Sequence, residues 1–223
     1  MRDLLDRIAV CIERGKSNLE SGYPPDLKGQ PGADELTKQA LEAGVSAEVV
    51  LAEGLITGMT AVGKRYSEGK AFVPDLLMAA KAMKAAMAHL KPYFESGQTH
   101  HRGTFVIGTV QGDLHDIGKN LVAMMLEGGG YKVIDLGVDV APEKFVEAVE
   151  ENPGCIVGLS ALLTTTMVNM ERIIQAIHEH NPDTKVIIGG APVNEDFARR
   201  IHANAYAPDP QRALDYLDAV VAG

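Results

Sequence analysis

"TFVIGTVQGDLHDIGKN", residues 104–120, decides the fold of the second half of this chain. An apolar run, Thr104–Val110, leads into a polar loop, and a helical stretch begins at Ile117. The same succession of strand, loop and helix then repeats to the end of the sequence. Strands rich in Val and Ile that alternate with helices indicate a parallel sheet covered on both faces.

The repeats predict a doubly wound α/β domain of five parallel strands, flavodoxin-like or Rossmann-like, over residues 104–223. In the flavodoxin-like strand order, ligands bind outside the carboxyl ends of the strands, where the order reverses. The loops after the first, third and fourth strands should meet at that rim, which places His115 at the ligand mouth. The predicted strands are 104–110, 131–137, 155–161, 185–190 and 205–207, and the predicted helices are 117–128, 142–151, 167–180, 194–201 and 210–222.

The first half follows a different pattern, because its apolar residues repeat at helical spacing up to about Ser96. Helices are predicted over 3–15, 33–44, 47–66 and 74–96. Their short connections predict an antiparallel four-helix bundle as an N-terminal domain, 1–96, followed by a linker, 97–103. The Pro- and Gly-rich segment 21–32 is predicted to be an irregular surface loop.

The composition argues against a protein that binds nucleic acid or a membrane. A chain of 223 residues with a formal net charge of −9 has no visible cationic patch, so a nucleic-acid partner is not expected. Cys11 and Cys155 lie far apart in apolar runs, which favours free buried thiols in a reducing compartment. Charges interrupt the N-terminal apolar stretch, so we expect neither a signal peptide nor a membrane partner, and a cytoplasmic protein.

The loop after the first strand carries the candidate chemistry. A carboxylate at Asp113 can accept the Nδ1–H of His115, which leaves Nε2 free to bind a metal or act as a base. The alternative is that both residues only decorate the loop, because short motifs match by chance. Asp116 is interpreted as the N-cap of the next helix and Lys119 as a solvated helix residue.

A metal held by His115 lacks obvious partners in the sequence. Zinc needs three or four protein ligands, and no cysteine or second histidine lies at zinc spacing. A single histidine suffices where the cofactor supplies the other ligands, as a tetrapyrrole-like macrocycle does.

Three short motifs resemble those of the cobalamin-binding domain of corrinoid proteins. Asp113–Gly118 matches its D-x-H-x-x-G signature, Ser160–Leu162 its S-x-L, and Gly189-Gly190 its G-G, in the same order and spacing. The stretch Val62–Met87 resembles the helical cap of the methyl-transferring members. The chain is similar to the small corrinoid protein of three-component methyltransferase systems, and to the cobalamin-binding module of methionine synthase.

The resemblance implies roles for individual residues. His115 would replace the dimethylbenzimidazole of cobalamin as the lower cobalt ligand, with Asp113 as its partner and Thr166 where relatives often have a serine. Tyr66, Val73 and Leu76 match positions that cover the upper face of the corrin in relatives. The implied contacts of the corrin and of its nucleotide tail, which lies in a slot beside the sheet, are Gly112, Asp113, Leu114, His115, Asp116, Ile117, Gly118, Ser160, Leu162, Thr164, Gly189 and Gly190.

The resemblance also implies a methyl carrier that uses cobalamin. A substrate-specific methyltransferase would place the methyl group on cobalt, and a second one would deliver it to tetrahydrofolate or a similar acceptor. A reductive activator protein is the third implied partner, and the chain would not be catalytic alone. The alternatives are a cobalamin-dependent sensor, a mutase subunit, and a metal-dependent phosphoesterase, although the further ligand motifs of the last are absent. The sequence does not determine the methyl donor.

Overall fold

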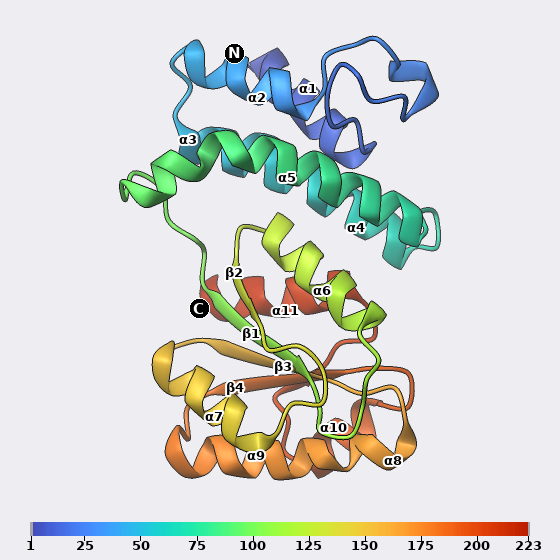
Figure 1. The fold of residues 1–223 in the computed structure, drawn as a ribbon, viewed down its shortest axis with the longest axis vertical. Coiled ribbons are helices and arrows are strands. Elements are labelled where there is room, and N and C mark those ends of the chain that lie inside the picture. Colours follow the sequence, from blue (N-terminus) through green and yellow to red (C-terminus); the bar gives the residue numbers. More distant parts are fainter. Residues whose placement is uncertain (1, 223) are drawn as a thin grey trace. The chain divides into compact units, whose positions relative to one another are not determined.

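The computed structural model of the chain describes residues 2–222, which form two compact units. One unit is helical and comprises the residues through His101 together with Gly128–Gly130. The other is an α/β unit formed by the remaining residues from Arg102 onward (Figure 1). Within residues 2–222, every helix is too short or too polar to cross a bilayer.

In the helical unit, α1 packs against α2 and α4, and both of these pack against α5. The amphipathic pattern of the sequence explains this arrangement, because the apolar side of each helix is buried. A hydroxyl at Ser46 caps the third predicted helix by accepting a hydrogen bond from the Val49 amide at 3.3 Å. The elements are α1 (Arg2–Glu13), η1 (Pro25–Leu27), α2 (Ala33–Glu42), α3 (Ala47–Val49), η2 (Val50–Ile56), α4 (Thr57–Ser67) and α5 (Val73–Glu95).

The helix predicted over 47–66 forms, but its hydrogen bonding changes along its length. The backbone adopts the wider π-helical pattern over Val50–Ile56 and returns to α-helix at Thr57. The Thr57 hydroxyl also bonds five residues back, to the carbonyl of Ala52 at 3.1 Å. At Gly54 an added Cβ would lie 3.0 Å from Ile8, so this segment runs close to α1.

The segment predicted to be an irregular surface loop is held by two charged side chains. Lys16 is buried and donates a hydrogen bond to the carbonyl of Ser21 at 2.7 Å. The carboxylate of Glu35 accepts the amides of Leu19 and Gly32, at 2.9 and 2.8 Å. The loop is therefore irregular, as predicted, but Glu35 in the first turn of α2 holds the backbone near both of its ends.

The α/β unit contains one five-stranded, entirely parallel sheet in the order β2-β1-β3-β4-β5, which confirms the predicted doubly wound fold. The register brings three strand ends level, because Thr109 lies opposite Ser160 and Ser160 lies opposite Gly189. The loops that follow these strands therefore emerge side by side. The strands are β1 (Thr104–Thr109), β2 (Lys132–Asp135), β3 (Ile156–Ser160), β4 (Lys185–Gly189) and β5 (Ala205–Tyr206).

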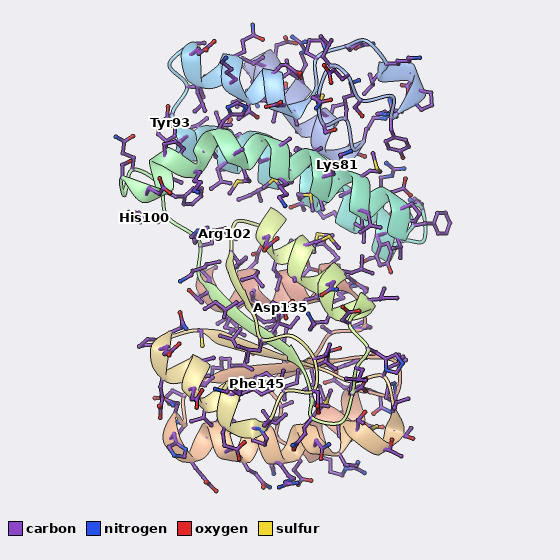
Figure 2. All side chains as sticks on the ribbon, viewed as in Figure 1. Lys81, Tyr93, His100, Arg102, Asp135 and Phe145 are labelled. Carbon is purple, nitrogen blue, oxygen red and sulfur yellow. The ribbon has the colours of Figure 1, made fainter. Side chains whose placement is uncertain are left out.

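Helices cover both faces of this sheet (Figure 1). One face packs against α6 (Ile117–Gly128) and α11 (Pro210–Ala222), and the other against α7 (Pro142–Glu151), α9 (Asn169–His180) and α10 (Glu195–Arg200). The three central strands, β1, β3 and β4, are therefore mostly buried, as their continuous apolar runs predict, whereas the edge strands β2 and β5 are only partly buried. On the second face the ring of Phe145 fills the space beside Gly108, where an added Cβ would come within 2.7 Å of it (Figure 2).

Gly58, in α4, offers a test of the helical packing. An alanine Cβ there would lie 2.5 Å from the carbonyl oxygen of Ala9 and 2.6 Å from Ile12 Cβ, both on α1. Gly→Ala inside a helix normally stabilises by about 0.5–1 kcal/mol, but overpacking costs about 1–3 kcal/mol. Gly58→Ala is therefore expected to lower the free energy of unfolding in urea titrations. The matched control is Gly118→Ala, because a Cβ at this second residue of α6 meets nothing within 4 Å; a Gly58→Ala protein as stable as this control would contradict the packing.

Candidate functional site

The carboxylate of Asp113, just beyond the end of β1, is fully buried and accepts hydrogen bonds at both oxygens. Oδ1 accepts from the backbone amide and from Nδ1 of His115, at 3.1 and 2.7 Å. Oδ2 accepts from the hydroxyl of Thr166 at 2.6 Å and from the amides of Leu162 and Leu163, at 2.8 and 3.3 Å. This one side chain therefore joins the loops that follow β1 and β3.

These contacts keep Asp113 ionised. Burial alone would raise the pKa of the Asp113 carboxyl, because it penalises the charged form. The hydrogen bonds from Thr166, from the Leu162 amide and from His115 outweigh that penalty and hold the pKa of this carboxyl well below its usual range. The site thus contains a permanent buried negative charge at neutral pH.

The imidazole of His115 is oriented by this charge. A carboxylate only accepts hydrogen bonds, so Nδ1 carries the proton and the Nε2 atom of the neutral ring keeps its lone pair. The side chain is 51% exposed, and its backbone carbonyl accepts the hydroxyl of Thr109 at 2.9 Å. The half-exposed ring therefore has a fixed tautomer, and its Nε2 is available as an acceptor or a ligand.

Thr166, at the position where relatives often have a serine, contacts Asp113. Thr166 is 7% exposed, in the short helix α8 (Thr164–Met167), and its hydroxyl makes the closest contact with Asp113. Leu162, of the S-x-L motif, contributes its backbone amide to the same oxygen. Thr164 is exposed at the start of α8, and its side chain lies outside this network.

The rim glycines fall into two kinds. Gly190 has φ +125°, and an added Cβ would lie 1.8 Å from the carbonyl oxygen of Ala161, so only glycine fits there. Gly112 also has a positive φ, +84°. At Gly189 a Cβ would lie 3.1 Å from the Ala207 carbonyl, whereas at Gly118 it would meet nothing. Gly112 and Gly190 thus shape the backbone of the rim, and Gly118 leaves space free.

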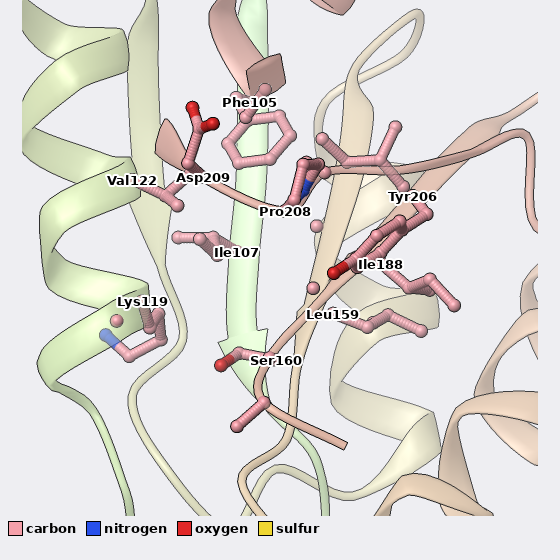
Figure 3. A pocket seen from close by; sticks show the side chains of 18 residues that line it. Phe105, Ile107, Lys119, Val122, Leu159, Ser160, Ile188, Tyr206, Pro208 and Asp209 are labelled. Atoms are coloured by element: carbon pink, nitrogen blue, oxygen red, sulfur yellow. The ribbon is translucent and has the colours of Figure 1, made fainter. Parts of the chain in front are cut away.

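That free space opens into a cavity of about 280 Å³ in the α/β unit, on the α6 and α11 face of the sheet (Figure 3). This volume is close to the lower end of the range for small-molecule pockets, roughly 300–1,000 Å³. The Ser160 hydroxyl points toward the side on which α6 lies. Most of the lining is apolar, and it includes Phe105, Ile107, Val122, Ile187 and Ala213 next to the rim residues Gly118, Ser160, Gly189 and Gly190.

Two large apolar side chains beside His115 are exposed to solvent. Leu114 is 72% exposed and Ile117 is 74% exposed. Exposed apolar groups at the edge of a polar site are typical of a surface that a ligand covers. Asp116, between them, directly precedes α6 and accepts the Asn120 amide and side chain, at 2.8 and 3.0 Å, so it lies at the N-cap as predicted.

The prediction for Lys119 was wrong. This side chain is buried, forms an ion pair with Asp135 at the end of β2, and donates to the Asn120 side chain at 2.8 Å. Its position in the first turn of α6 faces the sheet rather than solvent, and the cavity lining includes it. The signal in the sequence was the acid at the carboxyl end of the neighbouring strand, "YKVID".

Two further residues of the loop network were missed. Thr109 holds the carbonyl of His115, and Asp139 lies against the other side of the loop. The Asp139 amide donates to the Asp113 carbonyl at 2.9 Å, and its Oδ1 accepts the Gly112 amide at 2.7 Å. The available signal was again an acid just after β2, in "IDLGVDV".

The remaining candidates belong to the helical unit. Tyr66 is half-buried in the last turn of α4, Val73 is half-buried as the first residue of α5, and Leu76 is buried one turn further. Their predicted contact with a corrin ring stays a prediction.

Comparisons with known proteins agree with the sequence motifs. Two family models described as B12 binding domains match residues 103–214 and 30–91. The trimethylamine corrinoid protein 2 of Methanosarcina mazei is 42% identical over 193 residues, which cover 85% of this chain and 88% of the relative.

Solved structures give the same result. A chain of the methanol:cobalamin methyltransferase complex MtaBC from Methanosarcina barkeri superimposes with a TM-score of 0.82 at 32% identity, over 99% of this chain and 80% of that one. A cobalamin-binding protein from Desulfitobacterium hafniense superimposes with a TM-score of 0.76 at 31% identity, over 96% and 97% of the two chains.

The depressed pKa of Asp113 predicts how this residue affects acid unfolding. A carboxyl whose folded pKa lies below its unfolded value, about 3.9, contributes stability above that value and loses it as the pH falls toward the folded pKa. Asp113→Asn is expected to lower the free energy of unfolding at neutral pH by about 1.5–3 kcal/mol, because hydrogen bonds to a charged group are lost. The difference from the parent should shrink below about pH 4.

Urea titrations of the cofactor-free protein at a series of pH values measure this effect. Asp183→Asn is the matched control, because Asp183 is exposed in the connection between α9 and β4. A difference between parent and Asp113→Asn that stays constant from neutral pH down to about pH 2 would show that the carboxylate charge is not the stabilising group.

Proposed function

The chain belongs to the corrinoid proteins with B12-binding domains, and from this membership we propose that it carries methyl groups between two methyltransferases. The observation that carries the proposal is the His115 imidazole, which Asp113 holds through Nδ1 so that Nε2 keeps its lone pair; Gly118, three residues further along the chain, lines an apolar cavity. Family membership argues against the phosphoesterase alternative, and the names of the relatives favour a carrier over a sensor or a mutase subunit.

The residues at the rim fit a bound corrinoid. A single oriented imidazole suits a cofactor whose macrocycle supplies the other metal ligands. The exposed side chains of Leu114 and Ile117 offer an apolar surface next to that imidazole, and the space at Gly118 admits a ligand close to the backbone. The cavity on the same face offers a slot for the nucleotide tail of the cofactor.

When bound, the corrinoid supplies a cobalt centre that takes up and releases the methyl group. His115 would hold that cobalt through Nε2. Asp113 fixes the tautomer and the direction of the ring, and Thr166 fixes the carboxylate in turn.

In this function, partner proteins carry out the chemistry of the methyl donor and of the methyl acceptor. The partners would be a substrate-specific methyltransferase on the donor side, a second methyltransferase on the acceptor side, and a reductive activator protein. The names of the relatives, which include a trimethylamine and a dimethylamine corrinoid protein, support a methylated amine as the donor.

Reconstitution with cobalamin tests the ligand assignment. We expect about one cobalamin per chain, bound with a protein nitrogen on cobalt, because one oriented imidazole faces the proposed site. Electron paramagnetic resonance of the Co(II) form with isotopically labelled histidine identifies that nitrogen. His115→Ala should abolish the nitrogen coupling, whereas His180→Ala, which changes an exposed histidine of helix α9 in the same unit, should keep it. Coupling that survives in His115→Ala would contradict the assignment.

Cobalamin affinity separates the role of Thr166 from that of its neighbour Thr165. Loss of an outer-shell partner typically costs about 10–100-fold in metal affinity or activity. Thr166→Val is expected to weaken cobalamin affinity by about tenfold, the low end of this range, because it removes the 2.6 Å hydrogen bond to Asp113. Thr165→Val, in the same helix but exposed, should bind as tightly as the parent protein. Equal losses in the two variants would assign the effect to α8 as a whole.

Methyl transfer tests the carrier function itself. The cobalamin-loaded and reduced protein is mixed with a methyltransferase for trimethylamine, dimethylamine or methanol and the corresponding donor. Methylation is read from the absorbance of the cofactor. We expect methylation with an amine donor and its methyltransferase. A loaded protein that no such pair methylates would favour the sensor alternative.

A further inference from the structure

The connection from β2 to α7 runs along the loop that carries His115. Beyond the ends of the strands, the β1–β2 ladder continues through backbone bonds from Leu136 to Ile107 at 2.8 Å, from Thr109 to Gly137 at 3.0 Å, and from Val140 to Thr109 at 3.0 Å. Val110 and Val140 form a further parallel bridge. The segment 136–140 is therefore attached to the base of the His115 loop rather than free.

Asp139 makes the contact nearest to the site. Its amide donates to the Asp113 carbonyl at 2.9 Å, and its Oδ1 accepts the Gly112 amide at 2.7 Å. Both bonds require an unusual backbone, since Asp139 has φ +55° and Gly112 has φ +84°. Glycine adopts this left-handed conformation freely, and other L residues rarely do, although Asp and Asn are enriched there.

From this geometry we propose that Asp139 is a positioning residue for the metal-ligating loop; this rests on the proposed function of His115. Asp139 acts on the backbone of Gly112 and Asp113 from the β2 side, because its Oδ1 accepts the N–H of Gly112 and its amide donates to the C=O of Asp113. The Asp113 carboxylate is held from the β3 side by Leu162 and Thr166. With both ends of Asp113 fixed, the direction of the His115 ring is fixed as well.

The side chain and the backbone conformation of Asp139 can be separated by three substitutions. Asp139→Asn keeps an acceptor oxygen and a residue that tolerates positive φ. Asp139→Gly keeps the backbone conformation but removes the acceptor oxygen. Asp139→Ala removes the acceptor oxygen and also disfavours the conformation. If Asp139 served only as a turn residue, Asp139→Gly would equal or exceed the parent protein in every measurement. Asp183→Asn is the charge-matched control, at an exposed position outside this rim.

Two measurements then test the role. In the cofactor-free protein, hydrogen exchange of the Gly112 amide should be faster in Asp139→Gly and Asp139→Ala and unchanged in Asp139→Asn and Asp183→Asn. The second measurement is the affinity for cobinamide, a corrinoid without the nucleotide tail, whose binding depends on the His115 loop. Loss of one hydrogen bond is worth about 0.5–1.5 kcal/mol, so Asp139→Gly should weaken cobinamide binding about two- to tenfold and Asp139→Ala more. Asp139→Asn should restore it.

The outcomes separate this inference from the proposed function. If His115→Ala binds cobinamide as tightly as the parent protein, the ligand role of His115 fails. If His115→Ala binds weakly while Asp139→Gly matches the parent in both affinity and amide exchange, His115 keeps its role and the positioning role of Asp139 is overturned. Weakening by Asp183→Asn equal to that of Asp139→Gly would also overturn it, because net charge alone would then explain the effect.

Discussion

The rim of this protein depends on the buried carboxylate of Asp113. Removing an ion from water costs several kcal/mol even after relaxation, and it is tolerated only where hydrogen bonds satisfy the charge. Here the donors come from the same loop and from the loop after β3, so satisfying one charge requires both loops to take one arrangement. The orientation of His115 is a consequence of that requirement, because its Nδ1–H is one of the donors.

The parallel sheet makes such a carboxylate possible. Strands that run in the same direction release their loops at one edge, and the register sets Thr109, Ser160 and Gly189 level with each other. Close approach at this edge then excludes side chains, as the 1.8 Å distance from a Cβ at Gly190 to the Ala161 carbonyl shows. The cavity lies between these loops and α6 because Gly118 leaves its side of the helix empty.

The helices and strands, and the part of the site that lies within one loop, could be predicted from the sequence. Apolar periodicity predicted the parallel sheet and its helices, and the spacing of Asp113 and His115 predicted a contact between residues two apart. Contacts between strand exits were missed, because Lys119–Asp135 and Gly112–Asp139 join positions 16 and 27 residues apart, and their meeting depends on strand register. The π-helical stretch Val50–Ile56 escaped for another reason: a shift of one residue in hydrogen bonding leaves the apolar pattern of a helix almost unchanged.

The polar and apolar parts of the site have different tasks. The network around Asp113 is made entirely of groups of the chain, which hold the Nδ1 side of the His115 ring. The apolar part of the site is the exposed surface of Leu114 and Ile117 and the cavity lined by Phe105 and Ile107, and burial of apolar surface of this kind is favourable. The exposed apolar side chains take no part in the hydrogen bonds of Asp113, because all of the donors to its carboxylate are groups of the chain. The two parts are separate, because the hydrogen bonds that orient the imidazole do not involve the apolar side chains.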